Sequence, residues 1–409
     1  MIYHFLSLGQ ERKINRKGGM MKLSKIAQRA GTETAFEVLA RAKELERRGK
    51  EIIHFEIGEP DFDTPQNIKI AGIKAITDNF THYAPTQGIY ELRESVADYI
   101  SKTRRISVNP EEVIITPGGK DVIFSAALSL LDEGDEALYP NPGYPIYESA
   151  IRLTGATPVP IPLLEENDFA FDVNYFRKLI TDRTKLIIIN SPGNPTGGIL
   201  SKEALEAISE VAIERDILVL SDEIYSRIIY DGEFFSIASL PGMQERTIIL
   251  DGFSKTYAMT GWRLGYAVAN RDIIEGLKKI AVNSFSCVAT FVQMAGIEAL
   301  TGPQDEVERM RKEYETRRNL IIEGLNKIPG FSTKVPRGAF YAFPNIKKTG
   351  MKSKELADYL MNEGGVATLS GTSFGAYGEG YLRFSYATSQ EKIKEGLEKV
   401  RVAIEKIIK

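Results

Sequence analysis

The chain has 409 residues, a length at which one hydrophobic core usually divides, so we expect two domains. Hydrophobic residues make up 43% and charged residues 26% of the sequence, the balance of an ordinary globular protein. The formal net charge of -3 gives no electrostatic basis for binding nucleic acid or an anionic membrane. A single cysteine, Cys287, excludes an internal disulfide and is typical of a cytoplasmic protein.

The first residues of the chain differ in character from the rest. A short apolar run precedes a basic stretch from Arg12 to Lys17, but it has neither a positively charged start nor a small-residue cleavage site. It is therefore not interpreted as a signal peptide. We expect residues 1–20 to be a misassigned start or a flexible arm, with translation beginning at Met20 or Met21.

The next segment contains one helix and one strand. Apolar residues recur at helical spacing over Thr34–Arg48, and Gly49 provides a stop. The strand-like run Ile52–Ile57 follows and ends at Gly58. We assign residues 21–58 to a smaller domain that the C-terminal part of the chain completes.

Short apolar runs then alternate with helical patterns over residues 59–295. Several runs are apolar throughout, which is typical of strands covered on both faces. This alternation predicts an α/β fold, with a large domain whose mostly parallel sheet carries helices on both faces. The predicted strands are Val113–Thr116, Glu136–Tyr139, Leu186–Asn190, Ile217–Ser221, Thr247–Leu250 and Gly265–Ala269.

From about residue 296 to residue 409 the pattern changes to long charged helices around a few short strands. The predicted helices cover Asp305–Lys327, Lys352–Glu363 and Gln390–Lys406. This part is expected to form the smaller α+β domain together with residues 21–58. No linker rich in proline, glycine or serine separates the two domains, so we expect them to pack closely.

The most informative segment is Asp251–Gly265, which follows a predicted apolar strand. Lys255 comes just after the strand end, at the edge where open α/β sheets bind their ligands. Further along the segment, Arg263 carries a planar guanidinium that suits a phosphate. Alone, Lys255 would be interpreted as a surface lysine in a chain with 52 lysines and arginines. The whole segment favours a binding site.

Further polar residues follow other predicted strands. Asp222 and Tyr225 close one apolar strand, although Asp222 also suits the start of a helix. Asn194 lies in a turn rich in proline and glycine. Gly118 and Gly119 precede the predicted helix 121–131, where backbone N–H groups bind anions.

Arg383 stands in the apolar run Tyr381–Ala387 near the C-terminus. An arginine in such a strand is costly unless it is paired or binds an anion. Its geometry favours a carboxylate bound by two parallel hydrogen bonds.

In their order along the chain, these segments resemble the class I aminotransferases, the aspartate aminotransferase family of fold-type I pyridoxal-phosphate enzymes. The resemblance runs from about Gly58 to Ala387. It implies an enzyme that holds pyridoxal phosphate as a Schiff base on Lys255 and uses no metal. It also implies ping-pong transfer of an amino group from an amino acid to a 2-oxo acid.

The resemblance assigns catalytic roles to Lys255, Asp222 and Tyr225. Lys255 would move the α-proton, and Asp222 would keep the pyridine nitrogen protonated, so that the ring accepts electrons. The cofactor-binding residues would be Tyr83, Gly118, Gly119, Lys120, Tyr144, Asn194, Asp222, Tyr225, Ser254, Lys255 and Arg263. The substrate-binding residues would be Gly58, Lys120, Tyr144, Asn194 and Arg383.

The resemblance also predicts a homodimer, because Tyr83 would reach the phosphate of the neighbouring subunit. A role for Tyr83 as a core aromatic stays open. No partner beyond the amino acid and 2-oxo acid substrates is expected, and in particular neither a nucleic acid nor a membrane.

Lys120 favours a substrate class. Some family members place a lysine after the two glycines, where it meets the distal carboxylate of aspartate or glutamate. We therefore expect a dicarboxylic donor with 2-oxoglutarate, and the alternative is a solvated Lys120 in the first helical turn. Tyr144 departs from the tryptophan of many aspartate-specific members. This leaves an aromatic, kynurenine or alanine-type aminotransferase open, as well as a C–S lyase on the same fold.

A protein of another class, a transcriptional regulator with an aminotransferase-like sensor, is the remaining alternative. It would need a DNA-binding domain, whereas the residues before Gly58 contain mainly one predicted helix and one strand and no basic recognition helix. We therefore expect an enzyme.

Overall fold

The computed structural model of the chain describes residues 15–16, 19–20, 23–170 and 172–408. Most of residues 1–20, the expected misassigned start or arm, lies outside the described part. Its described residues form the short antiparallel strands β1 (Asn15–Arg16) and β2 (Gly19–Met20). None of the described helices combines the length and apolar character that crossing a bilayer requires.

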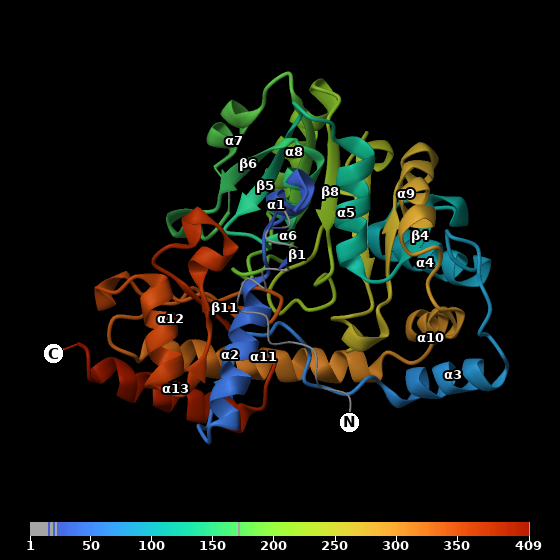
Figure 1. The fold of residues 1–409 in the computed structure, drawn as a ribbon. Coiled ribbons are helices and arrows are strands. Elements are labelled where there is room, and N and C mark those ends of the chain that lie inside the picture. Colours follow the sequence, from blue (N-terminus) through green and yellow to red (C-terminus); the bar gives the residue numbers. More distant parts are fainter. Residues whose placement is uncertain (1–14, 17–18, 21–22, 171, 409) are drawn as a thin grey trace.

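A seven-stranded sheet forms the core of the larger part of the molecule (Figure 1). The strand order is β4-β10-β9-β8-β7-β5-β6, and all neighbours are parallel except β10, which is antiparallel to both β9 and β4. The predicted mostly parallel sheet is confirmed. The strands are β4 (Val113–Thr116), β5 (Glu136–Asn141), β6 (Thr157–Pro162), β7 (Thr184–Asn190), β8 (Leu218–Asp222), β9 (Thr247–Gly252) and β10 (Gly265–Val268).

Strand β6 was not predicted, because prolines occupy alternate positions of its sequence, Thr157–Pro162. Proline has no N–H to donate to a strand ladder and is normally confined to sheet edges. The structure places β6 at the edge of the sheet, paired only with β5. Because an edge strand pairs on one side only, it tolerates prolines that a central strand would not.

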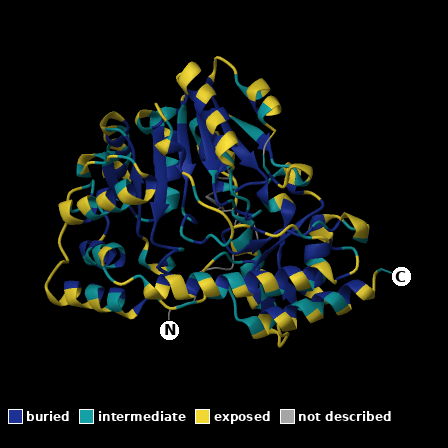
Figure 2. Ribbon diagram, turned by 180° about the vertical axis from the view of Figure 1, so that it is seen from behind, coloured by how far each residue is buried: buried dark blue, intermediate teal, exposed yellow. Residues whose placement is uncertain are grey.

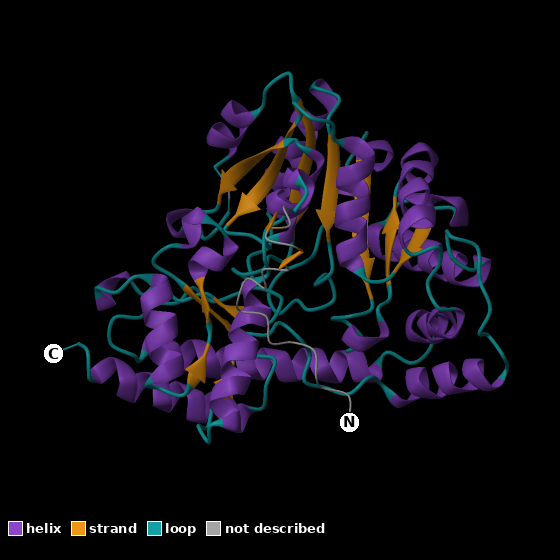
Figure 3. Cartoon of the chain, in the orientation of Figure 1, coloured by secondary structure: helices purple, strands orange, loops and turns teal. Residues whose placement is uncertain are grey.

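Helices cover both faces of this sheet (Figure 3). Side chains alternate across β7, so that Leu186 and Ile188 join one buried cluster while Ile187 and Ile189 join another. The strands are therefore buried while the outer faces of the helices are exposed (Figure 2). One face is covered by α5 (Gly119–Leu130), α6 (Ile146–Thr154) and α9 (Arg271–Ser284), and the other by α4 (Tyr90–Arg104), α7 (Val173–Leu179) and α8 (Lys202–Glu214).

The smaller part is built from both ends of the chain. Near the N-terminus, β3 (Ile53–His54) pairs in parallel with β12 (Val366–Ala367) from the C-terminal region. A second sheet joins β11 (Tyr341–Ala342), β14 (Leu382–Ser385) and β13 (Leu369–Ser370). The predicted fold class, a large α/β domain with a smaller α+β domain made from both chain ends, is confirmed. The remaining helices are α1 (Lys25–Arg29), α2 (Thr34–Arg47), α3 (Gln66–Thr77), α10 (Thr290–Thr301), α11 (Asp305–Asn326), α12 (Ser353–Asn362) and α13 (Gln390–Glu405).

Candidate active site

A cavity of about 530 Å³ lies where the parallel strands β7, β8 and β9 end. Most of the residues singled out in the sequence line this cavity. They are Gly58, Gly119, Lys120, Tyr144, Asn194, Asp222, Tyr225, Ser254, Lys255, Arg263 and Arg383. The crevice beyond the carboxyl ends of parallel strands is the usual ligand site of such sheets. The fold therefore brings together residues from both parts of the molecule at one place.

Lys255 follows β9 and reaches into the cavity. Its Nζ donates a hydrogen bond to the Gly58 carbonyl oxygen at 2.7 Å. Burial lowers the pKa of Lys255 to about 8, against the opposing charge of Glu59. At pH 7 roughly one tenth of an amine with this pKa is neutral, the form that acts as nucleophile or base.

Asp222 ends β8 and is only 5% exposed. Its carboxylate accepts hydrogen bonds from the Tyr147 hydroxyl at 2.7 Å and the Ile224 backbone N–H at 3.2 Å. Burial raises the pKa of Asp222 to about 6, although both hydrogen bonds lower it. Because a turn follows Asp222, the alternative that it starts a helix is wrong. Among the described residues no basic side chain pairs with it, so this buried carboxylate is suited to a cationic ligand atom.

Arg383 is a buried cation in the same cavity, 4% exposed. One of its nitrogens donates to the Asn194 side-chain oxygen at 3.1 Å and another to the Glu56 carbonyl oxygen. Its Nε is buried and has no hydrogen-bond partner among the described residues. Burial lowers the pKa of Arg383. A buried guanidinium held only by neutral oxygens is suited to an anion from solution.

Tyr341 was not identified in the sequence, yet it organises this corner of the cavity. Its hydroxyl lies 2.7 Å from that of Tyr225, and its ring centroid lies 4.5 Å from the Arg383 guanidinium carbon. A Cβ at Gly58 would lie 2.1 Å from the Tyr341 hydroxyl oxygen, so only glycine fits there. A tyrosine in the short strand Tyr341–Ala342 gives no sign of this role in the sequence.

The N-terminus of α5 forms a tight cradle beside Arg263. Gly118 has a φ of 94°, and a Cβ there would lie 2.5 Å from an Arg263 nitrogen. A Cβ at Gly265 would lie 2.7 Å from Gly118 and Gly119 backbone atoms. These glycines let the helix N-terminus, the guanidinium and the cavity wall meet, an arrangement that suits a phosphate. Ser254 adds a hydroxyl to the same cavity.

Lys120 lies in the first turn of α5, but it is not simply solvated. Its Nζ lies 2.6 Å from Oε2 of Glu33, a residue that directly precedes α2. The other oxygen of Glu33 accepts a 3.4 Å hydrogen bond from the Tyr144 hydroxyl. Glu33 was missed because no local pattern links it to Lys120.

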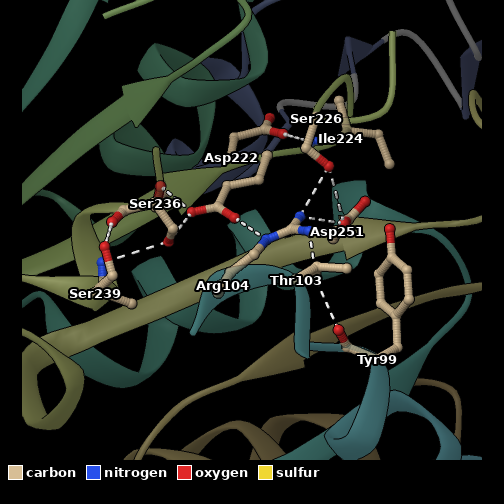
Figure 4. A network of polar contacts seen from close by, with 12 residues as sticks. Tyr99, Thr103, Arg104, Asp222, Ile224, Ser226, Ser236, Ser239 and Asp251 are labelled. Atoms are coloured by element: carbon tan, nitrogen blue, oxygen red, sulfur yellow. Dashed lines mark hydrogen bonds and ion pairs between the residues drawn. The ribbon is translucent and has the colours of Figure 1, made fainter. Parts of the chain in front are cut away.

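A cluster of charged residues lies near Asp222 (Figure 4), and its members do not line the cavity. Arg104 donates to the carboxylates of Glu223 and Asp251, each at 2.8 Å, and to the Ser226 hydroxyl. Burial alone would lower the pKa of Arg104, but the facing carboxylates raise it. The sequence offered one signal for this cluster, acidic residues within or beside apolar strands.

Tyr83 lies elsewhere, on the surface. The residue is 92% exposed, so the alternative of a core aromatic is wrong. It borders a second hollow of about 500 Å³ that also involves Cys287 and Phe291. Helix α3 exposes Ile70 and Ile73.

Comparison with known proteins adds independent information. A family model described as aminotransferase class I and II matches residues 50–400. The chain is 45% identical to an aspartate aminotransferase of Pyrococcus abyssi over 86% of this chain and 91% of the relative. It is 44% identical to aromatic-amino-acid aminotransferase 2 of Thermococcus litoralis over 88% of this chain and 92% of the relative. The solved aspartate aminotransferase of Thermus thermophilus with maleate has a TM-score of 0.90 and 38% identity, covering 94% of this chain and 100% of that one.

Proposed function

Because the chain belongs to the class I and II aminotransferase family, we propose that its amino donor is a dicarboxylic amino acid, aspartate or glutamate, with 2-oxoglutarate as acceptor. The resemblance found in the motifs is confirmed, and the protein is a pyridoxal-phosphate-dependent aminotransferase. Its substrates are an amino acid and a 2-oxo acid. The observation that carries the choice of donor is the presence of two cations, Arg383 and Lys120, in the lining of one cavity. Two cations in one cavity match the two carboxylates of such a donor.

The residues of the cavity fit pyridoxal phosphate. Asp222 is a buried carboxylate with no basic partner among the described residues, as a protonated ring nitrogen requires. The helix start at Gly118 and Gly119, with Arg263 and Ser254 beside it, suits the phosphate. When bound, the cofactor supplies an aldehyde for the amino group and a ring that accepts electrons.

The remaining cofactor contacts follow from the same cavity. Lys255 would hold the cofactor, while Tyr225 and Asn194 would donate to its phenolic oxygen. The Asn194 oxygen already accepts from Arg383, which leaves its NH₂ group free to donate. Tyr144, on the cavity wall, would lie against the ring.

The chain's own groups divide the chemical work. Lys255, with its lowered pKa, takes a proton from the α-carbon of the amino acid donor. In the second half-reaction it gives a proton to the α-carbon of the new amino acid. Asp222 stays anionic near neutral pH and keeps a proton on the ring nitrogen. Arg383 orients the α-carboxylate, and the lack of a side chain at Gly58 leaves room for Tyr341, whose ring lies against Arg383. Residues at the start of α2, including Phe36, line the cavity and would limit the entry of water.

We further propose a homodimer in which Tyr83 reaches the neighbouring cavity. The exposure of Tyr83 and of the apolar Ile70 and Ile73 on α3 supports a partner surface there. Light scattering during gel filtration gives the mass, and a monomer would contradict the proposal. Tyr83→Phe is expected to weaken cofactor retention on dialysis without dissociating the dimer.

A donor panel tests the proposed function. Aspartate, alanine, phenylalanine and kynurenine are each offered with 2-oxoglutarate, glutamate is offered with oxaloacetate, and the 2-oxo acid product is measured. We expect the highest kcat/KM with aspartate, and parallel double-reciprocal lines as ping-pong kinetics require. A higher value with phenylalanine or kynurenine would overturn the dicarboxylic choice. Release of ammonia or thiol without an acceptor would favour the C–S lyase instead.

A further inference from the structure

The carboxylate of Glu33 lies where a second negative charge of a substrate would be bound. Its Oε2 lies 2.6 Å from Lys120 Nζ, and its Oε1 accepts from Tyr144 at 3.4 Å. All three side chains line the cavity that also contains Lys255 and Arg383. Lys120 is therefore already paired with a carboxylate of the protein itself.

The position of Glu33 in the fold shows that this pairing is not a by-product of helix formation. Glu33 is the residue at the N-cap of α2, where a carboxylate is favoured by the free N–H groups and the helix dipole. Its side chain nevertheless makes no capping hydrogen bond and turns to Lys120 instead. The helix N-terminus offers it a second stabilising position when Lys120 is taken by another anion.

The partial exposure of the pair makes such an exchange feasible. The side chain of Lys120 is 38% exposed and that of Glu33 is 22% exposed. Ion pairs with this access to water are weak, in contrast to buried ones. A distal carboxylate can replace the Glu33 carboxylate on Lys120 at little cost, because one anion replaces another.

A donor with an uncharged side chain, such as phenylalanine, does not displace Glu33 from Lys120. With Glu33 in place, the ammonium of Lys120 is neutralised and does not face an apolar side chain as an unpaired charge. The same cavity then accepts a side chain without a negative charge.

We propose that Glu33 is a specificity-determining residue, an internal carboxylate that competes with the distal carboxylate of the substrate for Lys120. Exchange of this ion pair lets one cavity accept both dicarboxylic and uncharged donors. This inference rests on the proposed function.

The test compares Glu33→Gln with the parent holoenzyme. Glutamine keeps the size of the side chain and removes its charge. We expect kcat/KM to rise for aspartate and to fall for phenylalanine, so that their ratio increases about five- to tenfold, as a partly exposed ion pair allows on each side. The matched control is Glu37→Gln, an exposed carboxylate in the first turn of the same helix, which should leave the ratio unchanged.

A binding measurement separates specificity from damage to catalysis. Isothermal titration of the holoenzyme with succinate, a dicarboxylate without an amino group, should show tighter binding to Glu33→Gln, and 3-phenylpropionate weaker binding. In a Lys120→Met background, Glu33→Gln removes only the repulsion by a negative charge, so its gain in succinate affinity should be clearly smaller than in the parent, where it also removes the competition for Lys120.

Each outcome decides between the two proposals. A ratio and a succinate affinity that Glu33→Gln leaves unchanged, in an enzyme that turns over aspartate, overturn the inference and leave the proposed function intact. Equal losses with both donors also overturn it, since Glu33 would then serve only the fold of α2. If the parent enzyme turns over no dicarboxylic donor, the proposed function itself fails.

Discussion

Two groups of charged residues flank the active-site cavity, and they are built in opposite ways. Behind Asp222, the Arg104 side chain is 2% exposed and is held between Glu223 and Asp251, themselves 1% and 4% exposed. At the cavity wall, the pair of Lys120 and Glu33 is 38% and 22% exposed.

The difference indicates what each group can do. A buried cation with two carboxylates cannot lose a partner without leaving an uncompensated charge, so the Arg104 cluster is a fixed support for the ends of β8 and β9. A half-exposed pair loses little when water or another ion replaces one partner. The interior group therefore holds geometry, whereas the pair at the wall can respond to the substrate.

The largest effect is expected at Lys255, which lines the same cavity as Lys120 and Glu33. Lys255→Ala removes the nucleophile and the proton carrier together, so nearly all turnover should be lost. Visible absorbance of the dialysed protein should show bound cofactor without its covalent link to the chain. An unchanged absorbance spectrum would contradict the role proposed for Lys255.

Asp222→Asn tests the role of the buried carboxylate at the end of β8. A neutral amide cannot hold a proton on the ring nitrogen, so the rate of α-proton removal should fall by about 10²- to 10⁴-fold while the cofactor stays bound. The measurement is kcat with aspartate labelled by deuterium at the α-carbon, beside the absorbance of the bound cofactor. Near-normal turnover would make Asp222 a structural residue that only supports the turn after β8.

Stability should distinguish the two groups directly. Arg104→Met leaves two buried carboxylates unpaired and should lower the free energy of unfolding by about 3–5 kcal/mol. Lys120→Met, the matched change at the cavity wall, should cost about 1 kcal/mol or less. Urea unfolding followed by circular dichroism compares them, and equal losses would remove the distinction between a fixed and an exchangeable group.

The preference among amino donors should change when Lys120 is altered, but not when the Arg104 cluster is altered. Lys120→Ala should lower kcat/KM for aspartate and glutamate by about ten- to hundredfold, because a charge-assisted hydrogen bond is lost. The freed Glu33 carboxylate would also repel a dicarboxylic donor. The rate with alanine should hardly change, and the ratio between donors cancels general damage to the site. Equal losses for all donors would assign Lys120 to the cofactor or the fold.

A pH dependence of stability is also expected, from the buried carboxylate of Asp222. Burial raises the pKa of Asp222 from 3.8 to about 6, so in this range the folded protein binds the proton more tightly than the unfolded chain. Its contribution to stability is present below pH 4 and is lost as the pH rises through 6. In cofactor-free protein, the unfolding free energy of the parent relative to Asp222→Asn should therefore fall by about 1–3 kcal/mol between pH 4 and 7. A difference that does not change with pH would contradict the raised pKa.

The sequence predicted most of the sheet and the strand-end residues of the site. The patterns are local: an apolar run reveals a strand buried on both faces, and a polar residue just beyond it lies at the ligand edge of a parallel sheet. These local patterns place Lys255 and Asp222 at the ligand edge of the sheet, and the resemblance of their segments to the aminotransferase family assigns their roles. The failure to predict β6 also has a local reason, because its prolines argue against a strand and only an edge position accommodates them.

By itself, then, the sequence determined the fold class, the family, and the cavity residues that stand in recognisable segments. Only the tertiary structure decided which distant charges meet. Glu33 lies 87 positions from Lys120, and Arg104 lies 147 positions from Asp251. No periodicity connects such residues, because their partners are set by the way helices and strands pack and not by neighbours along the chain. The packing of α2 against the cavity thus added a carboxylate to the site that the motifs did not contain.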